Sequence, residues 1–143
     1  MKPKVILDTN SLLQILGAHS KYHHLLHCFL KNHFTLCIST AIMFEYEEIL
    51  REKASPVAAD FFLKLIVYSP NVVQKEPFIQ FGLISIDPDD NKFVDCAIVS
   101  QADFLVTDDT HFKELQKNNF PPVQVISLDK FSEIMLSQTD KFT

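Results

Sequence analysis

The sequence predicts an α/β fold with three layers, in which a central and mostly parallel sheet is covered by helices on both faces. One observation is that short apolar runs alternate with segments of helical period along the 143 residues. Another is that no linker, repeat or low-complexity tract interrupts the alternation. We therefore expect one domain over residues 1–136 and a frayed tail over residues 137–143.

The first half of the chain carries two strand patterns and four helical patterns. The strand patterns are short apolar runs at residues 5–7 and 35–38. The helical patterns follow a period of 3.6 residues, and one of them opens with a serine and a proline, which suit the start of a helix. We expect helices at residues 11–16, 21–31, 41–53 and 56–68.

The second half of the chain is less regular. Residues 71–80 could form short strands or a loop, and both alternatives stay open at this point. Strands are expected at residues 83–86, 104–107 and 123–126. Helices are expected from Asp89 or Asp90 to about Ala102, at residues 111–117, and at residues 127–136.

Acidic side chains recur where these elements meet. Asp8 follows the first strand directly, and Asp108 and Asp109 follow the run that ends at residue 107. Glu45 lies in the first two turns of the helix at 41–53, and Asp95 lies among apolar neighbours in the central helix. Since parallel strands present their carboxyl ends at one edge of a sheet, we expect several of these carboxylates to converge. Asp87 and Asp103 are interpreted as turn residues.

Converging carboxylates need a compensating charge. Two of them about 5 Å apart repel by roughly 3 kcal/mol at an effective dielectric constant near 20. The chain has a single arginine, Arg51, and its lysines are scattered, with Lys92 alone in the segment 88–109. A hard divalent cation with oxygen ligands, Mg²⁺ or Mn²⁺, would satisfy such a cluster.

Three segments resemble the PIN-domain nucleases, in particular the VapC-like toxin components of toxin–antitoxin pairs. They are VILDTN around Asp8, STAIMFEYEEILREK around Glu45, and DPDDNKFVDCAIVSQADFLVTDD, which contains Asp95 and Asp109. The resemblance covers nearly the whole chain. It implies a Rossmann-like three-layer fold and an endoribonuclease that hydrolyses RNA phosphodiester bonds with water activated by Mg²⁺ or Mn²⁺. It also implies a homodimer and a cognate antitoxin protein as partner.

The resemblance assigns roles to individual residues. The catalytic, metal-binding acids would be Asp8, Glu45, Asp95 and Asp109. Asp90 and Asp108 are further candidate ligands: Asp90 could instead cap a helix, and Asp108 competes with Asp109 for the fourth position. Asn10 and Thr107 would orient the ligands. Separately from the resemblance, we expect Lys92, the lysine of the segment 88–109, to contact the scissile phosphate.

Composition limits the remaining classes of function. The formal net charge of −5 argues against a large basic surface for nucleic acid, although a metal could reverse the sign of an acidic pocket. The two glycines, Gly17 and Gly82, lie in no phosphate-binding loop. Three cysteines without CxxC spacing, and no signal-peptide or membrane pattern, predict a cytoplasmic protein. The alternative function is a catalytically silent PIN domain that acts as a scaffold or binding module.

Overall fold

The computed structural model describes residues 2–84, 87–117 and 122–140. Its centre is a five-stranded sheet in the order β3-β2-β1-β4-β5, and all pairs of neighbouring strands are parallel. The predicted α/β class with a central parallel sheet is confirmed. The strands are β1 (Lys4–Leu7), β2 (Thr35–Ile38), β3 (Val72–Gln74), β4 (Phe104–Val106) and β5 (Val125–Ile126).

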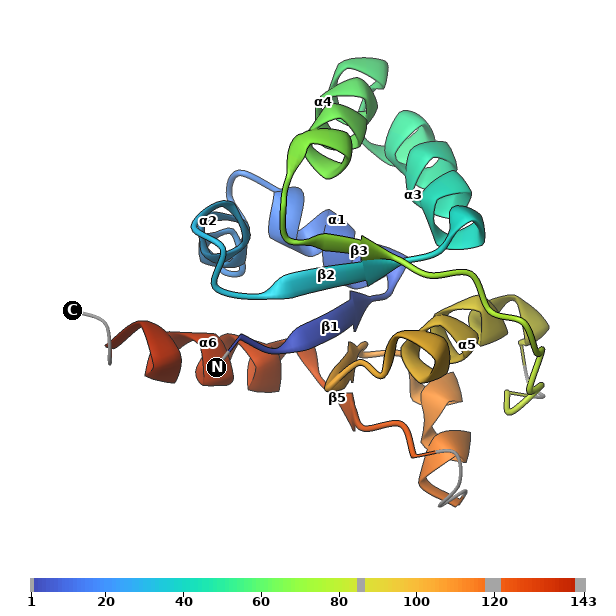
Figure 1. Ribbon diagram of the computed structural model, residues 1–143. Helices are drawn as coiled ribbons and strands as arrows, with labels where there is room; N and C mark the ends of the chain where they lie inside the picture. The colour runs from blue at the N-terminus through green and yellow to red at the C-terminus, as the bar shows by residue number, and fades with distance from the viewer. Residues whose placement is uncertain (1, 85–86, 118–121, 141–143) are drawn as a thin grey trace.

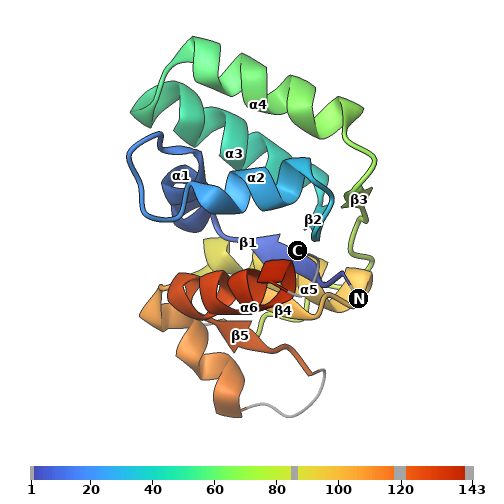
Figure 2. The ribbon, with the colours of Figure 1, turned by 90° about the vertical axis from the view of Figure 1, so that its left-hand side faces the viewer.

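Helices cover the sheet on both sides, as Figures 1 and 2 show, with α1 to α4 above the strands and α5 and α6 below them. The helices are α1 (Thr9–Leu16), α2 (His24–Leu30), α3 (Thr40–Lys53), α4 (Pro56–Tyr68), α5 (Asn91–Ser100) and α6 (Leu128–Asp140). Two 3₁₀ segments are η1 (Pro88–Asp90) and η2 (Thr110–Lys117). Helix α6 extends four residues beyond its expected end. Within the described ranges, no helix combines the length and the apolar character that a membrane crossing requires.

Short polar side chains start three of the helices. Asp8 caps α1, Ser39 caps α3 and Ser55 caps α4, and each accepts a hydrogen bond from the backbone N–H three residues later. Such a bond satisfies one of the four N–H groups that a helix leaves without a partner at its first turn. Asp8 and Ser39 also directly follow β1 and β2, so the chain passes from strand to helix at the carboxyl edge of the sheet.

The strand prediction for residues 83–86 is wrong in its described half. Leu83 and Ile84 are in no strand, and Ser85 and Ile86 lie outside the described residues. The side-chain amide of Asn91 exchanges two hydrogen bonds with the backbone of Ile84, at 2.8 and 2.9 Å. These bonds take the place of a neighbouring strand. The sheet is completed instead by β3, from the stretch that the sequence left open, which pairs with β2.

In the core, the side chain of Tyr46 connects α3 to the end of β1. This side chain is fully buried, packs against Phe62, and donates a hydrogen bond from its hydroxyl group to the backbone carbonyl of Leu7. Burial also raises the pKa of the Tyr46 hydroxyl well above 10. Because Leu7 is the last residue of β1, the bond fixes the end of the strand from which Asp8 projects.

Replacing Tyr46 with phenylalanine is expected to destabilise the protein by about 1–2 kcal/mol, because a buried carbonyl loses a hydroxyl partner while the ring is kept. Urea denaturation monitored by circular dichroism measures the change. Tyr68→Phe is the matched control, since Tyr68 is 82% exposed. Equal denaturation midpoints for the two variants would show that the Tyr46 hydroxyl contributes no stability.

Candidate active site

The order of the strands creates a crevice between β1 and β4. From β1 the chain proceeds to β2 and β3 on one side, and it then returns to β4 and β5 on the other. In open parallel sheets, ligands bind beyond the carboxyl ends of the strands at such a reversal. Leu7 is in register with Val106, and the N–H of Asp8 donates to the carbonyl of Val106 at 3.1 Å. This register places Asp8 beside Thr107.

Asp8 is held from two sides. Its Oδ1 accepts a hydrogen bond from the N–H of Ser11 at 2.8 Å, and its Oδ2 accepts one from the hydroxyl of Thr107. The residue is only 6% exposed. Burial raises the pKa of its carboxyl group, the hydrogen bonds from Thr107 and Ser11 lower it, and the charge of Asp108 raises it further. Asp8 is therefore a fixed acceptor whose negative charge is poorly solvated.

Thr107 connects Asp8 to Asp109. While its hydroxyl donates to Asp8, the same oxygen accepts a hydrogen bond from the N–H of Asp109 at 3.0 Å. Thr107 is buried and follows β4 directly, so its side chain cannot turn away to solvent. One hydroxyl group thus fixes the relative positions of two candidate acids.

Asp108 and Asp109 differ in what they bind. Oδ1 of the exposed Asp108 accepts a hydrogen bond from the N–H of Leu128 at 3.0 Å, at the start of α6. Oδ1 of Asp109 accepts one from the N–H of His111 at 2.9 Å. Both aspartates line a cavity of about 420 Å³ together with Asp8 and Asn10. The carboxylate of Asp108 therefore has a partner in α6, whereas Asp109 accepts from His111 with its carboxylate and donates to Thr107 from its backbone N–H.

Glu45 reaches the same region from α3. Its Oε2 accepts a hydrogen bond from the hydroxyl of Thr9, the neighbour of Asp8, and its Oε1 forms an ion pair with Nζ of Lys92 at 2.7 Å. The sequence assigned Lys92 to the substrate, but here its ammonium group contacts a candidate metal ligand.

A second acidic group surrounds His111. Nδ1 of His111 lies 3.2 Å from Oδ2 of Asp90 and 3.5 Å from Oδ1 of Asp109. The hydrogen bond to Asp90 raises the pKa of His111. Burial raises the pKa of Asp90, and His111 opposes this shift. Asp90, Asp87 and His111 each offer a ligand atom, and these three atoms lie within 4.8 Å of one another.

Sequence reasoning missed two members of this group. Asp87 was interpreted as a turn residue, and it does accept a hydrogen bond from the N–H of Asp89 at 3.1 Å. The sequence pattern predicts for His111 only the start of a helix. The available signals were the spacing of Asp87 and Asp90, three residues apart, and the position of His111 two residues after Asp109.

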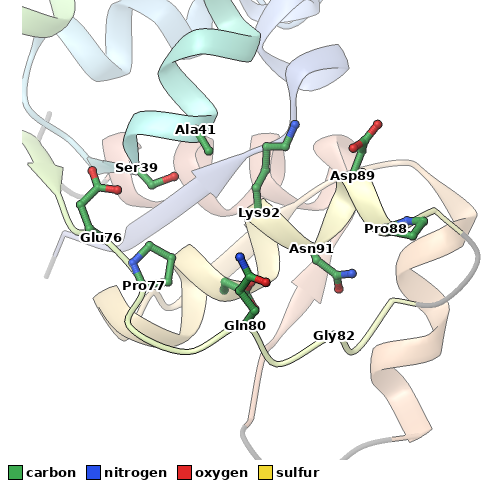
Figure 3. A pocket seen from close by; sticks show the side chains of 11 residues that line it. Ser39, Ala41, Glu76, Pro77, Gln80, Gly82, Pro88, Asp89, Asn91 and Lys92 are labelled. Carbon is green, nitrogen blue, oxygen red and sulfur yellow. The ribbon is translucent and has the colours of Figure 1, made fainter.

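Asp95 lies on α5 and is 5% exposed. Its Oδ1 accepts a hydrogen bond from the N–H of Phe81 at 3.2 Å, and burial raises its pKa. It lines a second cavity, of about 450 Å³. Lys92 and Gln80 line the same cavity, and Figure 3 shows these two side chains. The structure thus connects Asp8 and Asp109 by hydrogen bonds, whereas Asp95 is fixed by the segment that follows β3.

The donor atoms around the crevice fit a hard divalent cation. Carboxylate oxygens are the preferred ligands of Mg²⁺ and Mn²⁺, and Mn²⁺ also accepts an imidazole nitrogen. The grouping of Asp87, Asp90 and His111 supplies both kinds of donor within a small volume. The residues present can therefore hold a metal at this edge of the sheet.

Comparisons with known proteins agree with this fold. Residues 4–111 match the family model of the PIN domain. A comparison with curated protein sequences finds no match. Solved structures with a similar fold include VapBC2 from Rickettsia felis bound to a DNA fragment from its promoter. The TM-score is 0.60 at 19% identity, over 87% of this chain and 98% of that chain.

Two further structures are similar in fold at low identity. DNA-bound VapBC from Salmonella typhimurium has a TM-score of 0.57 at 17% identity, over 90% of this chain and 99% of that one. The Mycobacterium tuberculosis toxin VapC20, described as cleaving the Sarcin-Ricin loop, has a TM-score of 0.52 at 11% identity. That match covers 71% of this chain and 86% of the toxin.

Proposed function

The chain belongs to the PIN-domain family, and we propose that it is a metal-dependent endoribonuclease, the toxin component of a toxin–antitoxin pair. The observation that carries the proposal is the hydrogen-bonded unit of Asp8, Thr107 and Asp109 at the reversal point between β1 and β4. RNA as the substrate is supported by the similar fold of a toxin described as cleaving the Sarcin-Ricin loop.

Asp8, Glu45, Asp95 and Asp109 would hold one or two Mg²⁺ or Mn²⁺ ions, with Asp90 and His111 as further donors. A bound cation would offset the charge of the scissile phosphate and lower the pKa of a water molecule. Hydrogen bonds within the chain hold these acids in place. Thr107 fixes one oxygen of Asp8 and the backbone of Asp109, and the Ser11 N–H fixes the other oxygen of Asp8. Donors held in this way bind a metal without having to reorganise.

Asn10 is exposed and lines the same cavity as Asp8 and Asp109. We propose that Asn10 orients the metal ligands that line this cavity. Asp108, which is bonded to the start of α6, contributes negative charge to the cavity and is a weaker candidate for direct ligation. Between the two adjacent aspartates, Asp109 is our choice for the fourth ligand.

Two partners belong to the proposal. The similar VapBC structures support a cognate antitoxin protein. A net charge of −5 leaves little basic surface for RNA, so we expect a second subunit to complete the binding surface. A cytoplasmic location accords with this substrate. Gel filtration at micromolar concentration should give a dimer, and a strictly monomeric elution would contradict this part of the proposal.

The test of the function is cleavage of a labelled pool of structured RNA by tag-free protein with Mn²⁺, beside an EDTA control. We expect cleavage with Mn²⁺ and none with EDTA. Tag-free protein is needed because a histidine tag would itself bind metal. Binding of Mn²⁺ without any cleavage would favour the silent scaffold over the nuclease.

A further inference from the structure

The ion pair between Lys92 and Glu45 differs from the other lysine and arginine pairs of the described chain. The two side chains are only 23% and 24% exposed, and their charged atoms lie 2.7 Å apart. The ion pairs of Lys21 and Lys130 connect side chains that are all more than half exposed. The side chains in the two ion pairs of Arg51 are 40–60% exposed. A sheltered pair is screened less by water and salt, so water and salt weaken the contact between Lys92 and Glu45 less than these others.

The pair occupies an atom that a metal would need. Glu45 has two carboxylate oxygens: one accepts from Thr9, and the other is bound to the ammonium group of Lys92. An ammonium group and a divalent cation on the same oxygen would bring two like charges within a few ångströms. Lys92 and a cation therefore compete for Glu45.

We propose that Lys92 is a positioning residue that holds Glu45 toward the site until a divalent cation binds there, and that then turns to the phosphate of the substrate. The inference rests on the proposed function and deepens it, because it couples occupation of the metal site to the release of a phosphate-binding cation. Lys92 is thereby an internal counter-ion that tunes metal affinity.

The position of Lys92 permits its ammonium group to move from Glu45 to a substrate phosphate. Figure 3 shows its side chain extending from α5 past Ala41 of α3, with the ammonium group at the end remote from Gln80. The residue also lines the cavity of about 450 Å³ that contains Asp95. A four-carbon stem with rotatable bonds lets the ammonium group leave Glu45 without movement of the helix.

Nuclear magnetic resonance of lysine ammonium groups tests the release directly. The Lys92 signal is assigned with the Lys92→Arg variant, and Mg²⁺, which is diamagnetic, is added in steps. We expect the Lys92 signal to shift or broaden with the same midpoint as Mg²⁺ binding measured by calorimetry. The signal of Lys64, which is exposed on α4, should stay unchanged. Saturation with Mg²⁺ that leaves the Lys92 signal unaltered would overturn the inference.

Metal affinity provides a second readout that does not depend on catalysis. Lys92→Met should bind Mn²⁺ about fivefold more tightly than the wild type, the order of coupling found between groups in direct contact. Lys64→Met is the matched control and should bind within twofold of the wild type. Electron paramagnetic resonance of free Mn²⁺ measures both affinities.

A double-mutant cycle separates competition for Glu45 from a general effect of charge. In a Glu45→Gln background, Lys92→Met should change Mn²⁺ affinity by clearly less than in the wild type. Equal changes in both backgrounds would overturn the inference. If the cycle shows coupling but the wild type cuts no RNA, the proposed function and the move of Lys92 to a substrate phosphate fail, while the competition of Lys92 with the cation for Glu45 stands. If no divalent cation binds at all, both fail.

Discussion

Asp8→Asn is expected to reduce RNA cleavage by about 10³-fold while the protein stays folded. The substitution removes one negative charge from the centre of the candidate site, and a loss of this order follows when a principal electrostatic contact of a transition state is removed. The fold is preserved because asparagine also caps helices well: its amide oxygen can accept the hydrogen bond from Ser11 that starts α1.

Cleavage of the labelled RNA pool by wild type, Asp8→Asn and Asp60→Asn measures this effect. Asp60 is a suitable control because it pairs with Arg51 at an exposed position on α4. Its variant should cut as the wild type does. Retained cleavage in the Asp8→Asn protein would place the activity elsewhere, or in a contaminating nuclease, and an unfolded variant would contradict the account of the cap.

Asp8 also makes the stability of the wild type depend on pH, and the Asp8→Asn variant should lack this dependence. Burial raises the pKa of Asp8 above its usual 3.8, so the native state binds this proton more tightly than the unfolded chain does. The free energy of unfolding therefore decreases as the pH rises through the unfolded and then the folded pKa. With EDTA at neutral pH, Asp8→Asn should melt a few degrees above the wild type, and the difference should vanish once the pH is well below 3.8, where Asp8 is protonated in both states.

The sequence carries enough information for the layout of this edge of the sheet. Asp8 follows one short run of strand type and Thr107 ends another, and the parallel register then makes them neighbours. The ends of strands and the starts of helices can be predicted from the sequence, because they depend on residues that are close together in the chain. Strand β3 was left open because three residues, with Val72 and Val73 only partly buried, give too short a pattern.

Contacts that depend on side-chain direction could not be predicted. His111 meets Asp90 across 21 residues, and Lys92 meets Glu45 across 47. Each contact needs two rotamers and the path of a loop, none of which leaves a periodic signal. The strand expected at 83–86 failed because of a local side-chain contact: Asn91, seven residues later, binds both the N–H and the carbonyl group of Ile84, and such a contact leaves no periodic signal either.

Thr107→Val tests whether the buried hydroxyl group positions the two acids. Valine keeps the volume and the branching at Cβ, so the substitution removes little besides the hydroxyl group at this 4% exposed position. Asp8 loses one of the hydrogen bonds that lower its pKa, and the N–H of Asp109 loses its acceptor. Mn²⁺ affinity and cleavage should each decrease by about 10–100-fold, as found when a group that orients metal ligands is removed.

The pH dependence distinguishes this role of Thr107 from simple packing. Without the hydroxyl group the pKa of Asp8 rises further, and because carboxylates bind metal when ionised, the onset of Mn²⁺ binding should move to higher pH. Thr107→Ser keeps the hydroxyl group and loses only a methyl group, so it should return the onset close to that of the wild type. If the serine and valine variants bind Mn²⁺ alike at every pH, Thr107 acts through packing, and the bridge between Asp8 and Asp109 has no part in holding the metal.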